Sequence, residues 1–175
     1  QLWVVCPAGK YASTTAAKEC DDCPQGRYNN VTGGYIWNEE SKVQGHDNLS
    51  DCQICPAGMY ATVPADSFGY GVASGATECL VCPAGSYLTG VSNGTNSTAD
   101  YNCTSCVAGS YLADEGKNAS AALHDSVEDC QVCAAGYYSS NPRASSCNGT
   151  CPAGTYLDSA NASDHNDGSD CNNCT

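Results

Sequence analysis

Apolar residues are few and widely spaced along this chain. Leu, Ile, Val and Phe together number 21 of 175 residues, which is too few for a large hydrophobic core. No stretch approaches the roughly 18 apolar residues of a membrane helix, and the apolar positions show no 3.6-residue helical period. What recurs is a short unit in which a tyrosine follows a cysteine by five residues. This pattern predicts short turns and strands, with little or no helix.

The recurring unit has the form C-P-A-G-x-Y and occurs seven times. Gly always follows the Cys by three residues, whereas the Pro is replaced by Val107 in one copy and Ala134 in another. Pro restricts φ and Gly permits a left-handed turn conformation, so each copy predicts a tight turn and then a short strand. We expect the Tyr ring to lie over a neighbouring disulfide, with its hydroxyl group reaching water or backbone.

Each unit continues as a polar loop that ends at a second cysteine, commonly after an acidic residue: Glu19, Asp51, Glu78, Asp129 and Asp170. The loops absorb the variation in repeat length, because the copies start 17 to 32 residues apart. This organisation divides the chain into an apolar N-terminal segment (1–5), seven repeats (6–22, 23–54, 55–81, 82–105, 106–132, 133–150 and 151–173) and the start of a truncated eighth repeat (174–175).

The chain has fifteen cysteines, which can stabilise a fold that lacks a large hydrophobic core. A cysteine content above roughly 8–10% marks an extracellular scaffold in which disulfides replace core burial. The predicted fold is therefore a small, disulfide-rich, elongated tandem array of short β-turn and β-hairpin modules. Because the covalent links take over the role of a core, reduction is expected to unfold the protein.

Two disulfide patterns use the cysteines almost completely. Loop bridges would join Cys6 to Cys20, Cys23 to Cys52, Cys55 to Cys79, Cys82 to Cys103, Cys106 to Cys130, Cys133 to Cys147 and Cys151 to Cys171. The alternative places a bridge inside each C-x-x-C pair. The loop bridges are favoured because they close longer loops and because small C-x-x-C rings are typical of readily reduced redox pairs, although sequence alone does not decide connectivity. They leave Cys174 unpaired or available for an intermolecular bond.

The succession C-P-A-G-x-Y, polar loop, C-x-x-C resembles the ephrin-receptor-like cysteine-rich repeat and, more distantly, the first submodule of tumour necrosis factor receptor repeats. The resemblance covers nearly the whole chain. It implies an elongated ladder of small β-turn modules with one bridge per submodule. Such ladders occur in receptor ectodomains and in large surface proteins of protists, including ciliate surface antigens.

Sequons for N-glycosylation are unusually dense. Nine N-x-S/T sequences stand at Asn30, Asn48, Asn93, Asn96, Asn102, Asn118, Asn148, Asn161 and Asn173. Together with the cysteines they indicate an extracellular or cell-surface protein that has passed through a eukaryotic secretory pathway. N-linked glycans are accordingly the only non-protein groups expected.

The formal net charge of −13, with six Lys and Arg residues, argues against nucleic acid and against anionic membrane surfaces, since both partners require basic patches. No membrane insertion by this segment is expected, because no apolar stretch is long enough. Calcium is a weak candidate ligand. The acidic loop formed by Asp164, Asn166, Asp167, Gly168 and Asp170 misses the EF-hand register, so a solvated turn is the favoured interpretation. Redox and zinc chemistry at C-x-x-C are disfavoured by the secretory context.

No catalytic residue is predicted, and the chain is not expected to be an enzyme. His46, His124 and His165 stand in polar loops without a nucleophile motif and are expected to be solvated. Contact anchors are instead expected at the apolar segment Leu2, Trp3, Val4 and Val5, and at Trp37 in the longest loop. The alternative role for both places is simply to cap the first repeats.

These features together favour a structural role. Repeats that contact only their neighbours predict a rod, and a glycan-covered rod with an apolar end is suited to a subunit of an extracellular filament or cell-surface coat. Self-association would then be head-to-tail, with Leu2 to Val5 of one subunit docking near the Cys151 to Cys174 end of another. The alternative function is a receptor or adhesion ectodomain that binds a protein ligand through the loop carrying Trp37.

Overall fold

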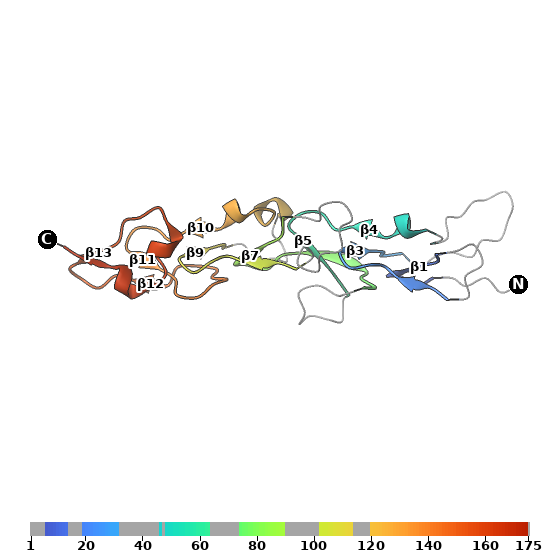
Figure 1. The fold of residues 1–175 in the computed structure, drawn as a ribbon, viewed down its shortest axis with the longest axis horizontal. Helices are drawn as coiled ribbons and strands as arrows, with labels where there is room; N and C mark the ends of the chain where they lie inside the picture. The colour runs from blue at the N-terminus through green and yellow to red at the C-terminus, as the bar shows by residue number, and fades with distance from the viewer. Residues whose placement is uncertain are drawn as a thin grey trace, which may run out of the picture. The chain divides into compact units, whose positions relative to one another are not determined.

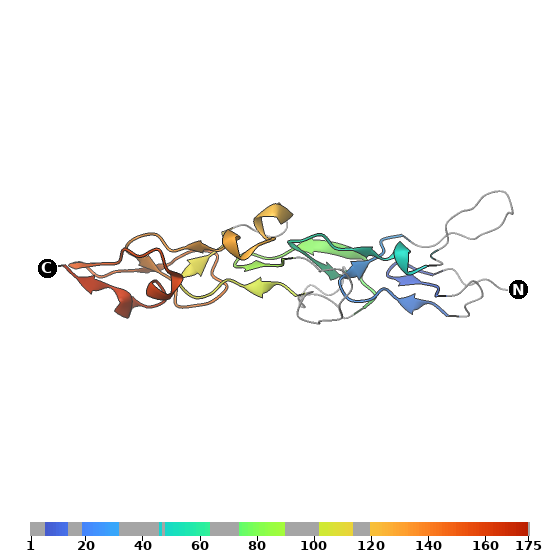
Figure 2. The same cartoon turned by 45° about the horizontal axis from the view of Figure 1, so that its top comes forward.

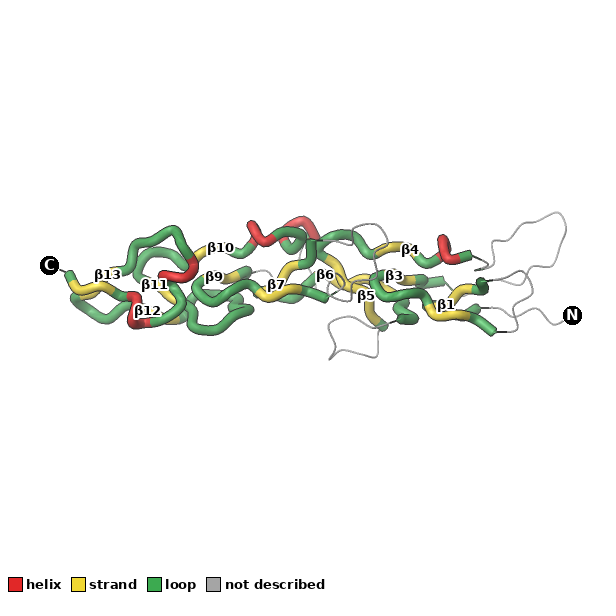
Figure 3. Tube along the Cα trace, in the orientation of Figure 1, coloured by secondary structure: helices red, strands yellow, loops and turns green. Residues whose placement is uncertain are grey.

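The fold is small, disulfide-rich and built from two-stranded β-hairpins (Figure 1). The computed structural model describes residues 6–13, 19–31, 46, 48–63, 74–89, 102–113 and 120–174. Within these ranges there is no α-helix, and the helical segments are single 3₁₀ turns, drawn in red in Figure 3. The predicted small, disulfide-rich fold of β-hairpin modules with little or no helix is therefore confirmed for the described residues. The chain forms two compact units: unit 1 (Gln1–Pro56, Tyr60–Leu80 and Gly90–Asn102) and unit 2 (Ala57–Met59, Val81–Thr89 and Cys103–Thr175).

Every hairpin pairs the strand of a C-P-A-G-x-Y unit with residues that flank the second cysteine of the same repeat (Figure 2). The pairs whose strands lie wholly in unit 1 are β1 (Lys10–Tyr11) with β2 (Asp21–Asp22) and β3 (Arg27–Tyr28) with β4 (Gln53–Ile54). A third pair joins β5 (Met59–Thr62) to β6 (Glu78–Val81). One 3₁₀ turn, η1 (Leu49–Asp51), precedes β4.

Unit 2 repeats the same hairpin four times. Its pairs are β7 (Ser86–Tyr87) with β8 (Thr104–Ser105), β9 (Ser110–Tyr111) with β10 (Gln131–Val132), β11 (Tyr137–Tyr138) with β12 (Gly149–Thr150), and β13 (Thr155–Tyr156) with β14 (Asn172–Asn173). All four are antiparallel. Its 3₁₀ turns are η3 (Ala121–Leu123), η4 (Val127–Asp129), η5 (Ala162–Asp164) and η6 (Gly168–Asp170).

A tight turn starts each hairpin, as the C-P-A-G-x-Y pattern predicts. The Gly of all seven copies has a φ between 76° and 86°, the left-handed value that a type II turn requires at its third position. In the first copy the N–H of Lys10 closes the turn on the carbonyl of Pro7 at 3.2 Å. Equivalent bonds of 2.9–3.2 Å are present in five further copies. The predicted turn and short strand are therefore confirmed.

Cysteines make up most of the buried apolar material. Among the described residues, twelve hydrophobic side chains are buried and seven of these are half-cystines. Three of the remainder, Leu88, Leu112 and Leu157, each follow the Tyr of a repeat. The interior is thus a series of small clusters, each centred on a disulfide, in keeping with the absence of a large hydrophobic core.

Seven disulfides close the repeats, with Cα atoms 5.6–5.8 Å apart. They join Cys6 to Cys20, Cys23 to Cys52, Cys55 to Cys79, Cys82 to Cys103, Cys106 to Cys130, Cys133 to Cys147 and Cys151 to Cys171. These are the loop bridges and not the bridges within C-x-x-C. Cys174 is a free, exposed thiol.

The turn glycines link each repeat to the next through backbone hydrogen bonds. The carbonyl of Gly109, for example, accepts the N–H of Cys133 at 3.0 Å, and its own N–H donates to the carbonyl of Ser139 at 2.8 Å. The first of these bonds recurs at all seven glycines, with N···O distances of 2.8–3.0 Å. The last of them is donated by Cys174, which therefore occupies the position of the first cysteine of a repeat.

The expectation that repeats contact only their neighbours is wrong. The turn glycine of repeat 5, Gly109, lies against the loop of repeat 7, where an added Cβ would overlap the carbonyl oxygen of Ala162 and lie 2.7 Å from its carbon. The same next-but-one contact occurs at Gly9, Gly58 and Gly85. It arises because the loop is long enough to fold back over the turn of the intervening repeat.

Candidate functional site

Buried histidines anchor the loops that fold back on earlier repeats. His124 and His165 are both 0% exposed, so the expectation that they are solvated is wrong for these two residues, and His46 is half-buried. All three begin the same sequence, H-x-[N/S/D]-x-x-D-C, which ends at the second cysteine of repeats 2, 5 and 7. Alignment of the repeats on their first cysteines does not reveal this motif, because the residues before the histidines differ in number from one repeat to the next.

His124 and His165 each hold the preceding repeat through two groups. The backbone carbonyl of each histidine accepts the N–H of the residue that follows the preceding repeat's Tyr, at 2.8 Å from Leu88 to His124 and 2.9 Å from Ser139 to His165. Its ring Nδ1 lies 2.8 Å from a carbonyl oxygen of the same earlier strand, that of Ser86 for His124 and that of Tyr137 for His165. A carbonyl can only accept, so Nδ1 is the donor in both cases.

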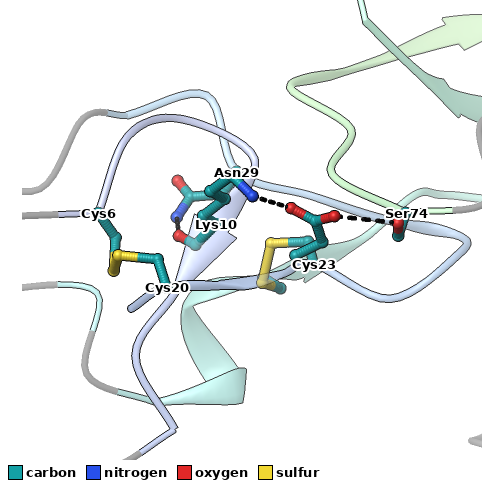
Figure 4. Close-up of polar contacts among 8 residues, drawn as sticks. Cys6, Lys10, Cys20, Cys23, Asn29 and Ser74 are labelled. Atoms are coloured by element: carbon teal, nitrogen blue, oxygen red, sulfur yellow. Dashed lines mark hydrogen bonds and ion pairs between the residues drawn. A yellow bond between two sulfur atoms is a disulfide. The ribbon is translucent and has the colours of Figure 1, made fainter. Parts of the chain in front are cut away.

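The first histidine clamp contains an additional amide. The carbonyl of His46 accepts the N–H of Ala12 at 2.6 Å, but its Nδ1 lies 2.8 Å from the Nδ2 of Asn29. The Nδ2 of Asn29 also donates to the carbonyl of Lys10 at 3.4 Å. Figure 4 shows Asn29 beside Lys10, near the disulfides of Cys6–Cys20 and Cys23–Cys52. The Asn side chain thus occupies the place that the imidazole ring takes in the two later clamps.

Capping boxes fix the path of the loop from each histidine to its second cysteine. The side chains of Asn48, Ser126 and Asp167 cap η1, η4 and η6, and the acid that precedes the cysteine accepts the N–H of the capping residue. In repeat 7, Asp170 accepts from Asp167 at 2.9 Å. Such reciprocal caps satisfy the free N–H groups at the start of a helical turn. The acid before the second cysteine therefore has a structural role.

The acidic loop of repeat 7 is occupied by these internal bonds. Asp170 also accepts the N–H of Asn166 at 3.1 Å, and Asp167 accepts that of Ser169 at 2.8 Å. Asp164 accepts from the Ser159 hydroxyl at 2.7 Å, and this bond is the main cause of the lowered pKa of Asp164. No group of three His, Cys, Asp or Glu side chains in the described ranges is placed to hold a metal ion.

Repeats 3 and 6, which lack the histidine, use alanine for the backbone contact. The carbonyl of Ala144 accepts the N–H of Leu112 at 3.0 Å, and that of Ala76 accepts the N–H of Asn29 at 3.0 Å. The residue before each alanine, Arg143 or Gly75, has a positive φ of 64° or 76°. Arg143 is the one non-glycine residue with such a φ among those described, and this conformation costs a side-chain-bearing residue roughly 1–2 kcal/mol.

The tyrosine hydroxyls differ from the expectation that they reach water or backbone. Tyr28 donates to the side chain of Gln53 at 2.9 Å, and Tyr111 donates to Gln131 at 3.0 Å. In both hairpins the two residues stand directly opposite each other. The Gln that follows the second cysteine in repeats 2 and 5 thus serves as a cross-strand partner.

One salt bridge joins the two strands of the first hairpin. Lys10 donates to the carboxylate of Asp22, which also accepts from the Ser74 hydroxyl at 3.3 Å. Figure 4 shows Lys10 and Ser74 on either side of this carboxylate. The hydrogen bond from Lys10 is the largest cause of the lowered pKa of Asp22.

Six of the nine sequons lie within the described residues, and the asparagine of each is exposed: Asn30, Asn48, Asn102, Asn148, Asn161 and Asn173. The other three, Asn93, Asn96 and Asn118, lie outside the described residues, as do the predicted contact residues Leu2, Trp3, Val4, Val5 and Trp37. An oligosaccharide could therefore be attached at each described position without displacing a buried side chain.

No protein-family model matches the chain, and comparison with curated protein sequences finds no match. No helix of the described part is both long and apolar enough to cross a bilayer. Seven disulfides in 175 residues are typical of an extracellular or secreted protein.

Proposed function

We propose that this chain is an extracellular structural glycoprotein, a heavily N-glycosylated subunit of a filament or cell-surface coat that assembles head-to-tail. The observation that carries the proposal is the coupling of repeats by their turn glycines. All seven are bonded to the next repeat, and Gly9, Gly58, Gly85 and Gly109 also contact the next but one. A binding module needs a rigid platform only around its ligand, whereas here the same bonds recur along each unit with nearly constant geometry. Such continuous coupling suits a protein whose role is to resist deformation along its length.

Two further observations support this proposal. The histidines and capping boxes of repeats 2, 5 and 7 fix the paths of polar loops, and the histidines of repeats 5 and 7 are buried. The sequons, in contrast, are exposed at every described position. An ordered backbone with glycans attached to its exposed surface is the arrangement expected of a coat. A receptor or adhesion ectodomain remains the alternative function, but no feature of the described residues specifically favours it.

The proposal is tested with the glycoprotein secreted from eukaryotic cells under non-reducing conditions. Sedimentation velocity of the full chain is compared with that of a variant lacking residues 1–5 and with the point variant Cys174→Ser. We expect the full chain to form large assemblies and the deletion variant to remain monomeric. Cys174→Ser should lose covalent cross-links only. Assembly of the deletion variant into fibres would refute the head-to-tail mechanism, and a monomeric full chain at high concentration would refute the filament itself.

A further inference from the structure

Repeat 6 contains an open hollow on its surface. The hollow has a volume of 480 Å³ and is lined by residues of this one repeat, between Tyr138 and Gly149. This volume lies within the roughly 300–1,000 Å³ of small-molecule sites. Repeat 6 also has one residue more than the other repeats between its second cysteine, Cys147, and the next first cysteine, Cys151. Two of the three residues between these cysteines, Asn148 and Gly149, line the hollow.

Three backbone hydrogen bonds and one disulfide fix the segment that lines the hollow. The N–H of Arg143 donates to the carbonyl of Cys106 at 2.9 Å, and the carbonyl of Ala144 accepts from Leu112. At the other end, the N–H of Ser139 donates to the carbonyl of the buried His165. The Cys133–Cys147 disulfide closes the base of the loop. The cavity is therefore part of the folded framework and does not require a ligand to form it.

The chemistry of the lining selects a neutral, hydroxyl-rich ligand. The chain has 19 Asp and Glu residues, yet none of them lines the hollow, and the single charged side chain there is that of Arg143. The remaining surface offers serine hydroxyls, Asn amides, Pro142 and the ring of Tyr138. The ring packs on Gly149, where an added Cβ would lie 2.3 Å from its nearest atom. Polar groups beside an apolar ring face suit a sugar, which has hydroxyl edges and C–H faces.

A sugar attached to the protein is available at the rim. Asn148 begins the sequon Asn148-Gly149-Thr150 and itself lines the hollow. Its Oδ1 accepts from the Ser146 hydroxyl at 3.0 Å, which holds the side-chain amide in place and leaves Nδ2, the atom that carries an N-linked glycan, unbonded. A tethered ligand has a millimolar effective concentration, so weak contacts are enough to keep it bound.

We propose that the hollow of repeat 6 binds the proximal sugars of the N-linked glycan carried by Asn148. This inference rests on the proposed glycoprotein character of the chain, because it requires that sequons are occupied. It assigns to one glycan a fixed place against the protein, whereas the glycan on Asn161 projects from an exposed loop of the same unit that has no part in the hollow.

The test is site-resolved removal of glycans from the native, non-reduced protein by peptide N-glycosidase F. Release at Asn148 and at Asn161 is followed over time by mass spectrometry, with heavy-oxygen water marking each converted asparagine. Asn148 should be released about tenfold more slowly, the ratio expected if its glycan is unbound about a tenth of the time. After denaturation and reduction the two rates should converge.

A variant separates binding in the hollow from other causes of slow release. Ser145→Tyr places a bulky side chain in the lining and should raise the native release rate at Asn148 to that at Asn161, which should itself be unchanged. Equal native rates at the two sites in the unaltered protein would overturn the inference, as would an unmodified Asn148 in a protein glycosylated elsewhere. In both cases the proposed glycoprotein character would survive. Absence of glycans at every sequon would instead refute the proposed function.

Discussion

The next-but-one contact between repeats can be tested by a matched pair of glycine substitutions. Gly109 and Gly136 occupy the same position in repeats 5 and 6, with φ values of 83° and 80°. Both donate to the following repeat, and both accept from its first cysteine. They differ in one respect, since an added Cβ would overlap the Ala162 carbonyl at Gly109 and would meet nothing within 4 Å at Gly136.

The expected losses of stability follow from this difference. Alanine in the left-handed conformation costs roughly 1–2 kcal/mol at either position. At Gly109 the loop of repeat 7 must also move away, and overpacking of this kind typically costs about 1–3 kcal/mol. Gly109→Ala should therefore lower the free energy of unfolding by about 2–5 kcal/mol, and Gly136→Ala by about 1–2 kcal/mol.

The assay combines guanidinium unfolding of the oxidised protein with amide hydrogen exchange. Exchange is needed because repeat arrays can lose one contact without unfolding as a whole. In Gly109→Ala, protection should fall most at the N–H of Ser139 and at that of His165, which lie where the loop of repeat 7 packs. Equal losses of stability in the two variants, with unchanged protection at these amides, would show that the next-but-one contact contributes nothing.

Three further perturbations address the loop anchors and the first hairpin. His124→Ala should lower the free energy of unfolding by about 2–4 kcal/mol, because it leaves a cavity and an unpaired Ser86 carbonyl. Leu123→Ala, at an exposed neighbour, should lower it by under about 0.5 kcal/mol. Equal effects of the two variants in thermal unfolding would refute the anchoring role. Arg143 has a φ of 64°, so Arg143→Gly should be more stable than Arg143→Ala, which removes the same side-chain contacts, by roughly 1 kcal/mol; equal melting temperatures of these two variants would contradict this. The Asp22 carboxylate has a lowered pKa in the folded state. Its contribution to the stability of the fold is therefore complete above the ordinary pKa of 3.8 and is lost as the pH falls through the pKa of the folded state. Both partners of this salt bridge are partly exposed, at 39% for Lys10 and 44% for Asp22, so the bridge should contribute under about 1 kcal/mol to the free energy of unfolding. Asp22→Asn should remove a loss of stability of that size between pH 5 and pH 2. The same pH profile of stability in the variant and the unaltered protein would argue against the bridge.

The hairpins could be predicted from the sequence because their determinants are local. A glycine three residues after each first cysteine specifies the turn, and loop length distinguishes the two ways of pairing the cysteines. Both depend on residues that are close in sequence, and spacing alone reveals them. The same is true of the acid before the second cysteine, although its role as a helical cap becomes evident only from the path of the chain.

The histidine anchors could not be predicted from the sequence in the same way. Their partners are backbone carbonyls of the preceding repeat, which carry no side-chain signature, and the loops before them vary in length. Alignment backward from the second cysteine would have revealed the motif at His46, His124 and His165. A histidine in a polar loop is usually solvated. What makes two of these buried is the fold-back of the loop over an earlier strand, which is a tertiary effect.

The most direct test of the structural role is electron microscopy of the natively isolated, non-reduced glycoprotein. Long uniform fibres with a regular axial repeat are the expected result, since subunits whose repeats are coupled by their turn glycines and which join head-to-tail should give a continuous particle. Short monodisperse particles at every concentration would contradict the filament and coat, and would favour an ectodomain that binds a protein ligand.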